Sequence, residues 1–495
     1  MRAALLSLFF AWTVAAQTNP VVALDRSITL NEAIELALKH NLDLQLVRLE
    51  PQRAEFALAG SYGVYDPNIG LSAQRNGSSS PSFVTGGGIS IAGGERETTS
   101  VGISNPGISA YLPTGGRITA DLTLDDQVNE PNPRQISADT GISLSQPLLR
   151  DLLIDGPRAT IQINKKALSQ SEWQVRQRVM EILYQVEEAY YNLIFTRENV
   201  KVQETALELA NQLLRENKKR VEVGALAPLD EKQAEAEVAS TRAELIDAKR
   251  QLAVQQNTLK SLLTDKYAEW AGINLAPSET LLAIPVNADL LESWRRGLTL
   301  RPELHSQQLN LEITDINLRL AKNNTLPALD LNGGYGHNSG IWNRKSVALR
   351  NLKSDDFRNY SYGLTLSFPL GNRAARNEYR RTKVTREQEE LRLKQLEQQI
   401  LLQIEDSIRL IESDFQRVAA TRSARVFAEE ALRAEQRKLE SGKSTSFLVL
   451  QFQRDLTRAR FQEIQALADY NKSLAQLALY EGTMLDRHKL STTLH

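Results

Sequence analysis

The residue types that carry out most enzymatic chemistry are sparse in this chain and show no productive spacing. Its 495 residues contain no cysteine and five histidines. The histidines are scattered, without an HExxH motif or a pair four residues apart, so they do not predict a metal site and are interpreted as surface or loop residues. Without cysteine there is no disulfide framework and no thiol chemistry. The histidines are His40, His305, His337, His488 and His495.

Two other patterns approach chemical motifs but favour simpler interpretations. Gly86, Gly87 and Gly88 lack the Lys-Ser/Thr pair and the strand–helix context of a phosphate-binding loop, which favours a flexible loop. The acidic pairs Glu187-Glu188 and Glu389-Glu390 lie in stretches rich in Lys, Arg and Gln, which favours solvated helix faces over acid–base catalysis. We therefore expect no catalytic residue, no metal and no cofactor.

Composition and the N-terminus narrow the class of protein further. The net charge of −1 gives no support for a nucleic-acid partner. Residues 1–16 combine an early arginine, an apolar core and small residues at Ala15 and Ala16, which predicts a secretory signal peptide. The rest of the chain has no apolar run of about 18 residues, so we expect no transmembrane helix. If the mature protein crosses a membrane, it must do so as a closed β-barrel.

The elements that would position functional residues occur twice in the same order. Each copy has a helical stretch, alternating strands that end in Pro-Leu, a very long helix, a glycine turn and a further helix. In the first copy, Asn31 is the expected N-cap of a helix over 28–58, and Pro51 is expected to kink it. The predicted segments are a first repeat 28–271 (strands 66–147, long helix 156–222, helix 228–266), a connector 272–289, a second repeat 290–484 (strands 327–370, long helix 373–441, helix 445–481) and a tail 485–495.

The strand segments are only weakly hydrophobic. Their alternation is typical of strands with one face toward lipid and the other toward water, although a soluble antiparallel sheet would look similar. The stretch 77–133 makes the first strand region much longer than the second. It is interpreted as a long external loop, a periplasmic flap or extra β-structure. Aromatic residues flanking the strands predict an interfacial girdle, with core packing as the alternative for the first two: Tyr62, Tyr65, Trp342, Phe357, Tyr360 and Tyr362.

The helix lengths indicate how each repeat is built. A helix of about 67 residues spans roughly 100 Å, and the two flanking helices reach a similar length when placed end to end. Each repeat is therefore expected to pair one continuous helix with two stacked shorter ones. The four main strands expected per chain are fewer than the eight or so of the smallest membrane barrels. Closure then requires oligomerisation, and we expect three chains.

With this duplicated order, the chain resembles the TolC-type outer membrane efflux protein family over nearly the whole mature sequence. The resemblance rests on the segments LNEAIELALKHNLDL, QPLLRD and FPLGNR and on the turns RVEVGALAPLDEKQAEAE and RKLESGKSTSFLVLQFQRDL. It implies an α+β membrane protein with an internal two-fold structural repeat. The expected assembly is a homotrimeric β-barrel, embedded in outer-membrane lipid and continuous with a long periplasmic α-helical barrel.

The resemblance also implies a function. Family members are passive exit channels of tripartite efflux or export systems, joined to an inner-membrane transporter by a periplasmic adaptor, and are not enzymes. We expect this chain to conduct small toxic molecules across the cell outer membrane. One alternative is the outer-membrane duct of a type I protein secretion system. An alternative of another class is a non-channel structural coiled-coil envelope protein.

The glycine turns are the sites that the resemblance marks as periplasmic tips. The turn residues are Gly224, Pro228, Gly442, Ser444 and Thr445. The candidate constriction residues are Asp230, Phe447, Leu448 and Gln451. Leu448 and Gln451 stand where the family pattern has acidic residues, whereas Asp230 matches a family aspartate. Three copies of Asp230 would form a negative constriction, and Phe447 with Leu448 an apolar one. The alternative for Asp230 is an ordinary acid in the first turn of a helix.

Overall fold

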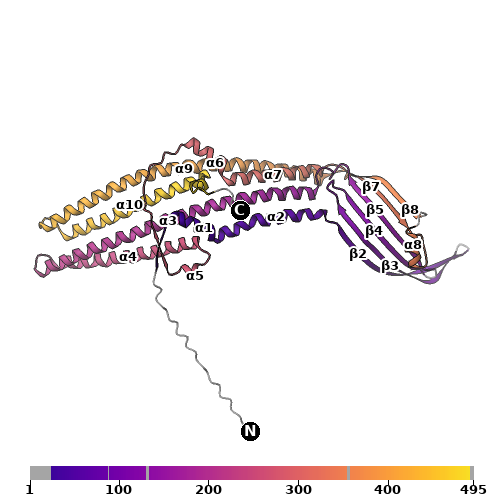
Figure 1. The fold of residues 1–495 in the computed structure, drawn as a ribbon, viewed down its shortest axis with the longest axis horizontal. Coiled ribbons are helices and arrows are strands. Elements are labelled where there is room, and N and C mark those ends of the chain that lie inside the picture. Colours follow the sequence, from indigo (N-terminus) through magenta and orange to yellow (C-terminus); the bar gives the residue numbers. More distant parts are fainter. Residues whose placement is uncertain (1–23, 87–88, 130–132, 354–356, 491–495) are drawn as a thin grey trace, which may run out of the picture. The chain divides into compact units, whose positions relative to one another are not determined.

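The computed structural model describes residues 24–86, 89–129, 133–353 and 357–490 (Figure 1). The predicted signal peptide at 1–16, Gly87, Gly88 and His495 lie outside these residues. The chain divides into two compact units. The first, called the turn unit here, comprises residues up to Val47, Arg176–Arg301 and residues from Gln399. The second, called the sheet unit, comprises Arg48–Val175 and Pro302–Gln398.

The helices repeat in order and in length. The first copy has 11, 20, 67 and 36 residues in its four main helices, and the second has 11, 22, 68 and 36. None of the helices in the described part of the chain is both long and apolar enough to cross a membrane. The main helices are α1 Leu30–His40, α2 Leu42–Ser61, α3 Gly156–Glu222, α4 Pro228–Leu263, α6 Leu290–Leu300, α7 Pro302–Asn323, α9 Arg373–Glu440 and α10 Ser446–Glu481. Short helices are α5 Tyr267–Trp270, α8 Lys345–Asn351 and α11 Met484–Arg487, with a 3-10 turn at Tyr62–Tyr65.

The first helical stretch differs from the prediction. Residues Leu24–Ile28 form strand β1, which pairs in parallel with β6, Ile273–Pro277, inside the predicted connector. The N-cap is Thr29, whose hydroxyl accepts from the Glu32 amide at 3.2 Å, and not Asn31. The break falls at Asn41, because its side chain accepts from the Leu44 amide at 3.0 Å and so starts a new helix. Pro51 lies inside α2, which continues past it.

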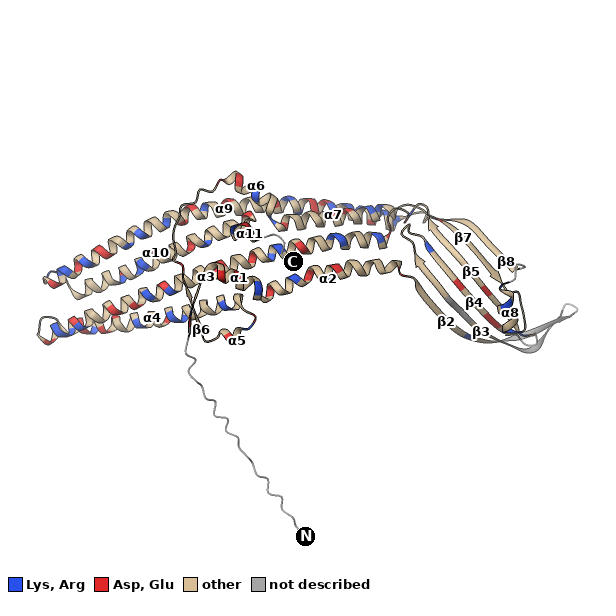
Figure 2. Ribbon diagram, viewed as in Figure 1, with Lys and Arg blue, Asp and Glu red and all other residues tan. Residues whose placement is uncertain are grey.

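Apolar stripes on the two long helices form much of the helical core. On α3 the predicted residues at spacings of three and four are buried, among them Val179, Ile182 and Val186. On α9, Ile400 and Ile404 are buried, whereas Phe415 is 38% exposed. Charged side chains lie densely along the helices, while the strands carry few (Figure 2). The long helices therefore pair a buried stripe with a charged remainder.

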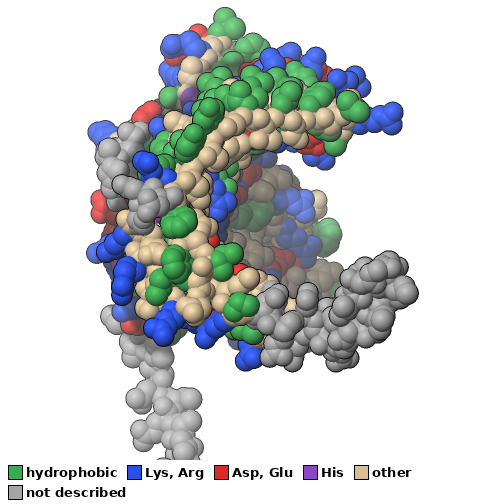
Figure 3. Space-filling model, turned by 90° about the vertical axis from the view of Figure 1, so that its right-hand side faces the viewer, with side chains coloured by type: hydrophobic (Ala, Val, Ile, Leu, Met, Phe, Trp, Pro, Cys, Tyr) green, Lys and Arg blue, Asp and Glu red, His purple; other side chains and the backbone are tan. Residues whose placement is uncertain are grey.

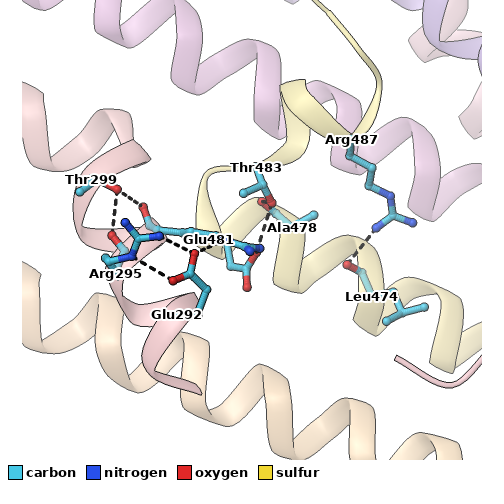
Figure 4. A network of polar contacts seen from close by, with 9 residues as sticks. Glu292, Arg295, Thr299, Leu474, Ala478, Glu481, Thr483 and Arg487 are labelled. Atoms are coloured by element: carbon cyan, nitrogen blue, oxygen red, sulfur yellow. Dashed lines mark hydrogen bonds and ion pairs between the residues drawn. The ribbon is translucent and has the colours of Figure 1, made fainter. Parts of the chain in front are cut away.

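The C-terminal segment belongs to the turn unit, so the predicted tail from residue 485 is wrong. After α10 ends at Gly482, with φ +79°, the chain forms α11 and buries Met484 and Leu485. Figure 4 shows the polar contacts around this end: Arg487 donates to the Leu474 carbonyl at 3.0 Å. Glu292 of α6 accepts from Arg295 at 2.7 Å, and Arg296 also reaches Glu481 of α10 at 3.6 Å. These contacts hold α6, α10 and α11 together.

The sheet unit contains a six-stranded antiparallel sheet, two strands more than the four main strands predicted. Its strand order is β2-β3-β4-β5-β7-β8. Of the three interpretations of the stretch 77–133, the structure supports extra β-structure, because β3, β4 and the end of β2 fall within it. The strands are β2 Asn68–Gly86, β3 Ile89–Tyr111, β4 Arg117–Asn129, β5 Gln135–Pro147, β7 Ala328–Asn338 and β8 Arg358–Ser367.

Candidate functional site

The two glycine turns of the turn unit share one backbone motif. Gly224 and Gly442 have φ of +72° and +73°, in the left-handed region that glycine adopts without a steric penalty. In the first turn the Ala225 amide donates to the Arg220 carbonyl at 2.7 Å, and in the second Lys443 donates to Lys438 at 2.8 Å. This six-to-one bond is the Schellman ending of a helix. The same geometry therefore closes both long helices.

The helices that follow the turns begin with different caps. Pro228 occupies the first position of α4. The N-cap of α4 is Ala227, whose side chain cannot accept a hydrogen bond. The side-chain cap of this helix is therefore the Asp230 carboxylate, which accepts from the Ala227 amide at 3.2 Å. At α10 the Thr445 hydroxyl accepts from the Leu448 amide at 3.4 Å. The first turn therefore uses a charged cap and the second a neutral one.

Near the second turn, one hydroxyl group and one lysine contact the buried Glu435. Ser444 donates to Glu435 at 2.5 Å, and Lys438 donates to the same carboxylate at 2.9 Å. These two contacts, with the Ser444 hydroxyl first, lower the pKa of Glu435 below its ordinary value. In the first turn, Lys232 and Lys218 lower the pKa of Glu235 in the same direction. Each hairpin therefore carries a glutamate whose pKa is lowered by neighbouring hydrogen-bond donors.

A buried amide joins the two turns. Asn217 of α3 is fully buried. Its side-chain nitrogen donates to the Asp230 carbonyl at 3.3 Å, and its oxygen accepts from the Ser446 hydroxyl at 2.9 Å. Arg220 also donates to the Leu439 carbonyl of α9 at 3.4 Å. One side chain thus contacts the first turns of both α4 and α10.

A second tie between the hairpins is ionic. Arg454 of α10 donates from Nε to both carboxylate oxygens of Glu237 of α4 at 2.9 Å. The hydrogen bond to Glu237 raises the pKa of Arg454. The Glu237 side chain is only 9% exposed, whereas that of Arg454 is 61% exposed. The burial is therefore asymmetric, with the acid inside and the guanidinium at the surface.

The predicted constriction residues fall into two groups. Phe447, Leu448 and Gln451 are exposed on the first turns of α10, with Phe447 57% exposed and Leu448 38% exposed. Asp230 is half-buried and its carboxylate is directed to the backbone of its own turn. The first turn instead exposes two apolar side chains, Val223 and Leu229. The structure thus gives Asp230 the capping role that was its alternative interpretation.

The sheet of the sheet unit separates polar from apolar side chains. The register places Ile118 of β4 opposite Leu144 of β5, and Ile142 of β5 opposite Tyr335 of β7. Residues of this parity form what we call the apolar face, along which hydrophobic side chains gather (Figure 3). The exposed side chains of this face include Ile69 and Leu71 of β2, Leu331 and Tyr335 of β7, and Tyr360, Tyr362, Leu364 and Leu366 of β8.

The opposite side, called the polar face, carries the intervening residues. Thr119 pairs with Ser143, Thr123 with Asp139, and Asn332 with Gly363. Further members are Asp121, Asp125, Ser137, Asp330, Ser361 and Thr365. The apolar face is itself exposed, whereas a soluble sheet buries its apolar face in a core, so this sheet differs in design from a soluble one. It matches a sheet between lipid and water.

The aromatic residues predicted to form a girdle divide by location. Tyr360 and Tyr362 are 77% and 84% exposed on the apolar face. Phe357 is exposed near Gly340, while Trp342 packs against Ile136 and Ala138. Tyr62 is exposed and Tyr65 half-buried in the 3-10 turn before β2. The girdle arrangement is therefore clearest on β8.

Sequence reasoning missed several polar residues that the fold buries. Glu187 was interpreted as part of a solvated face, but it is fully buried and pairs with His488 and, at 3.6 Å, with Arg487. His488 is correspondingly buried and not a surface histidine. Asn217 and Glu237 carried no signal for their contacts to α10, because Ser446 and Arg454 are more than 200 residues away. Among the described residues, no group of three or more potential ligands is placed to hold a metal ion.

An exposed apolar sheet face, together with paired helical hairpins, defines the class of an outer-membrane channel fold. The chain belongs to the outer membrane efflux protein family, whose model matches residues 33–264 and 295–483. The predicted family, fold class and localisation in the outer membrane and periplasm are confirmed. The family consists of channel proteins.

Curated relatives and solved structures agree with this assignment. The outer membrane protein TolC of Vibrio cholerae is 21% identical over 262 residues, covering 53% of this chain and 57% of that protein. TolC of Escherichia coli is 25% identical over 231 residues, covering 43% and 46%. The alignments thus span about half of these relatives.

Solved structures match over a greater length. The Campylobacter jejuni CmeC outer membrane channel has a TM-score of 0.66 at 16% identity, covering 92% of this chain and 85% of that one. A membrane protein from Pseudomonas aeruginosa has a TM-score of 0.69 at 18% identity, covering 94% and 92%. At these identities the likeness establishes the fold alone.

Proposed function

We propose that this protein is a homotrimeric, passive exit channel of a tripartite efflux system in the outer membrane, without catalytic activity. The observation that carries the proposal is the sheet with one apolar, exposed face and one polar face. In a bilayer the apolar face would contact lipid and the polar face would line water.

The edges of the sheet support assembly with further copies. β2 and β8 each pair on one side only, and every residue of β8 is exposed. A long unpaired edge in lipid leaves backbone groups without partners, at a cost of several kcal/mol each. Pairing β8 of one chain with β2 of the next removes both edges and closes a ring by head-to-tail contacts. Three copies of the six-stranded sheet would supply eighteen strands.

The paired turns would form the closable end of the channel. In the proposed closed state, Asn217 and the Glu237–Arg454 pair hold the two hairpins together. Opening would separate the hairpins and break these contacts. In the closed state, the exposed Phe447 and Leu448 would narrow the entrance as an apolar ring, with Gln451 beside them and Asp230 adding negative charge.

The proposed partners are a periplasmic adaptor and an inner-membrane transporter, and the proposed cargo is small toxic molecules. Family membership supports this version. A type I protein secretion duct would use the same fold, so transport assays with each cargo class must separate the two.

Planar bilayer recording tests the channel itself. The purified full chain should give stepwise conductance in a zwitterionic bilayer. A folded oligomer without conductance would overturn the channel proposal and favour the structural coiled-coil alternative.

A substitution at the turn tests the gate. Asp230→Ala should change single-channel conductance or block by divalent cations, whereas Asp247→Ala, an exposed acid of α4 paired with Arg250, should not. Equal behaviour of both variants would leave Asp230 as a helix cap only.

A further inference from the structure

On both edge strands of the sheet, the hydrophobic side chains of the apolar face are followed by a cation. On β8 the residues of this face run Leu366, Leu364, Tyr362, Tyr360 and then Arg358. On β2 they run Ile69, Leu71, Ala73 and then Arg75. The β8 order of aliphatic, aromatic and then cationic side chains is the one expected where a strand passes from the lipid core into the headgroup layer, and β2 follows it without the aromatic step.

Helix α8 adds further cations at the same end of the sheet. Ala348 is fully buried against Ile136 and Ala138 of β5, with Leu352 packed beside them. Ile136 and Ala138 belong to the apolar face, so α8 lies on that face. His337 pairs with Thr140 of β5 and with Arg358 of β8, and Ala138 lies two residues from Thr140 along β5. α8 therefore lies at the same end of the sheet as Arg358.

Most cations in the segment from Ile341 to Arg358 have no acidic partner among the described residues. Between Ile341 and Arg358 the sequence has five cations and two acids. Lys345 forms an ion pair with Asp126 at 3.1 Å, and Arg134 donates to the same carboxylate. Arg344, Arg350 and Lys353 are exposed and have no ion pair with any described residue.

Exposed apolar side chains accompany these cations. Ile341 is 68% exposed and Leu349 is 44% exposed. An amphipathic segment with exposed apolar and basic side chains is suited to the boundary between acyl chains and headgroups.

We propose that Arg75, Arg344, Arg350, Lys353 and Arg358 form a basic collar that binds the phosphate groups of anionic lipids whose acyl chains cover the apolar face. The inference rests on the proposed function, because it requires that face to lie in a bilayer. Arginine suits this ligand, since its guanidinium forms paired hydrogen bonds with phosphate oxygens. The occupant is a lipid and not free phosphate, because the collar borders an apolar surface that only acyl chains would cover.

Lipid retention by the purified full chain tests the collar. The probes are a lipid with two phosphate groups, lipid A, and zwitterionic phosphatidylcholine, each titrated in neutral detergent and counted by native mass spectrometry. Lipid A should bind more tightly. Arg350→Gln with Lys353→Gln should weaken lipid A binding by about thirtyfold, with little effect on phosphatidylcholine. Inorganic phosphate at matched ionic strength should not displace lipid A.

The matched control removes the same charge elsewhere. Lys249→Gln with Arg250→Gln on α4 should leave lipid A binding unchanged. Equal loss in both double variants, no loss in the collar variant, or displacement by inorganic phosphate would overturn the collar. Conductance of each variant in a zwitterionic bilayer separates the two proposals. Conductance without lipid selectivity overturns the collar alone, whereas a folded chain without conductance overturns the channel.

Discussion

The two glycine turns have the same backbone and different chemistry. Gly224 and Gly442 differ by one degree in φ, and each precedes a helix of 36 residues. The first turn is capped by the Asp230 carboxylate, whereas the second is capped by Thr445 and exposes Phe447 and Leu448. The backbone of each turn therefore requires only a residue in the left-handed region, which leaves the remaining positions to serve separate roles.

The largest effect on this comparison is expected at Asn217, which both turns share. Asn217→Ala removes two hydrogen bonds at a buried site and should cost about 2–3 kcal/mol of stability. Amide hydrogen exchange should become faster in both turns. Asn211→Ala, which loses a bond to Leu207 within α3, serves as the control. Faster exchange in one turn only would contradict a shared hub.

Removing either partner of the Glu237–Arg454 ion pair should lower stability, and removing Arg454 should lower it more. Arg454→Ala leaves the buried Glu237 carboxylate without its partner and should cost about 2 kcal/mol. Glu237→Ala leaves an arginine that water can solvate, so the cost should be nearer 1 kcal/mol. Urea unfolding measures both, with Arg458→Ala on the same helix as the control. A larger cost for Glu237→Ala would show that the burial is not asymmetric.

The turn glycines should behave alike. Gly224→Ala and Gly442→Ala each meet no atom within 4 Å, so the cost is conformational only. We expect about 1 kcal/mol at both sites. Gly156→Ala, which also has open space but no positive φ, should cost nothing. Unequal costs at the two turns, measured by thermal unfolding, would break the equivalence of their backbones.

The smallest expected effect is the response of the second turn to low pH, through the carboxylate of Glu435. The pKa of Glu435 is lowered in the folded chain, so its contacts stabilise the second turn above the ordinary carboxyl pKa of 4.5. That stability is lost as the pH falls through the lowered pKa. Ser444→Ala removes the largest cause and should make hydrogen exchange of the second turn less sensitive to pH as the pH falls below 4.5. An unchanged pH profile would show that Lys438 alone sets the ionisation.

Much of the helical part followed from local pattern. The structure has α3 at Gly156–Glu222, with the bounds expected, and α9 ends within one residue of its expected end. Heptad spacing and a glycine after each long helix are local signals, and helix geometry converts them directly into length. The N-cap of the first helix was harder to predict, because two nearby residues have the residue type of a cap. Asn31 has the residue type of a cap, but Thr29 holds that position, because strand β1 ends at Ile28.

The amino-acid sequence by itself determined the duplication, the helix lengths, the glycine turns and the alternation of the strands, because each of these depends on residues within a few turns or strand steps. Only the tertiary structure decided that residues 77–133 extend the sheet to six strands and that Asn217 bridges to Ser446, 229 residues away. It also decided that Glu187 is buried beneath His488, 301 residues further along. Periodicity reports which face of an element is apolar, whereas the segment that covers a given side chain depends on contacts between distant parts of the chain.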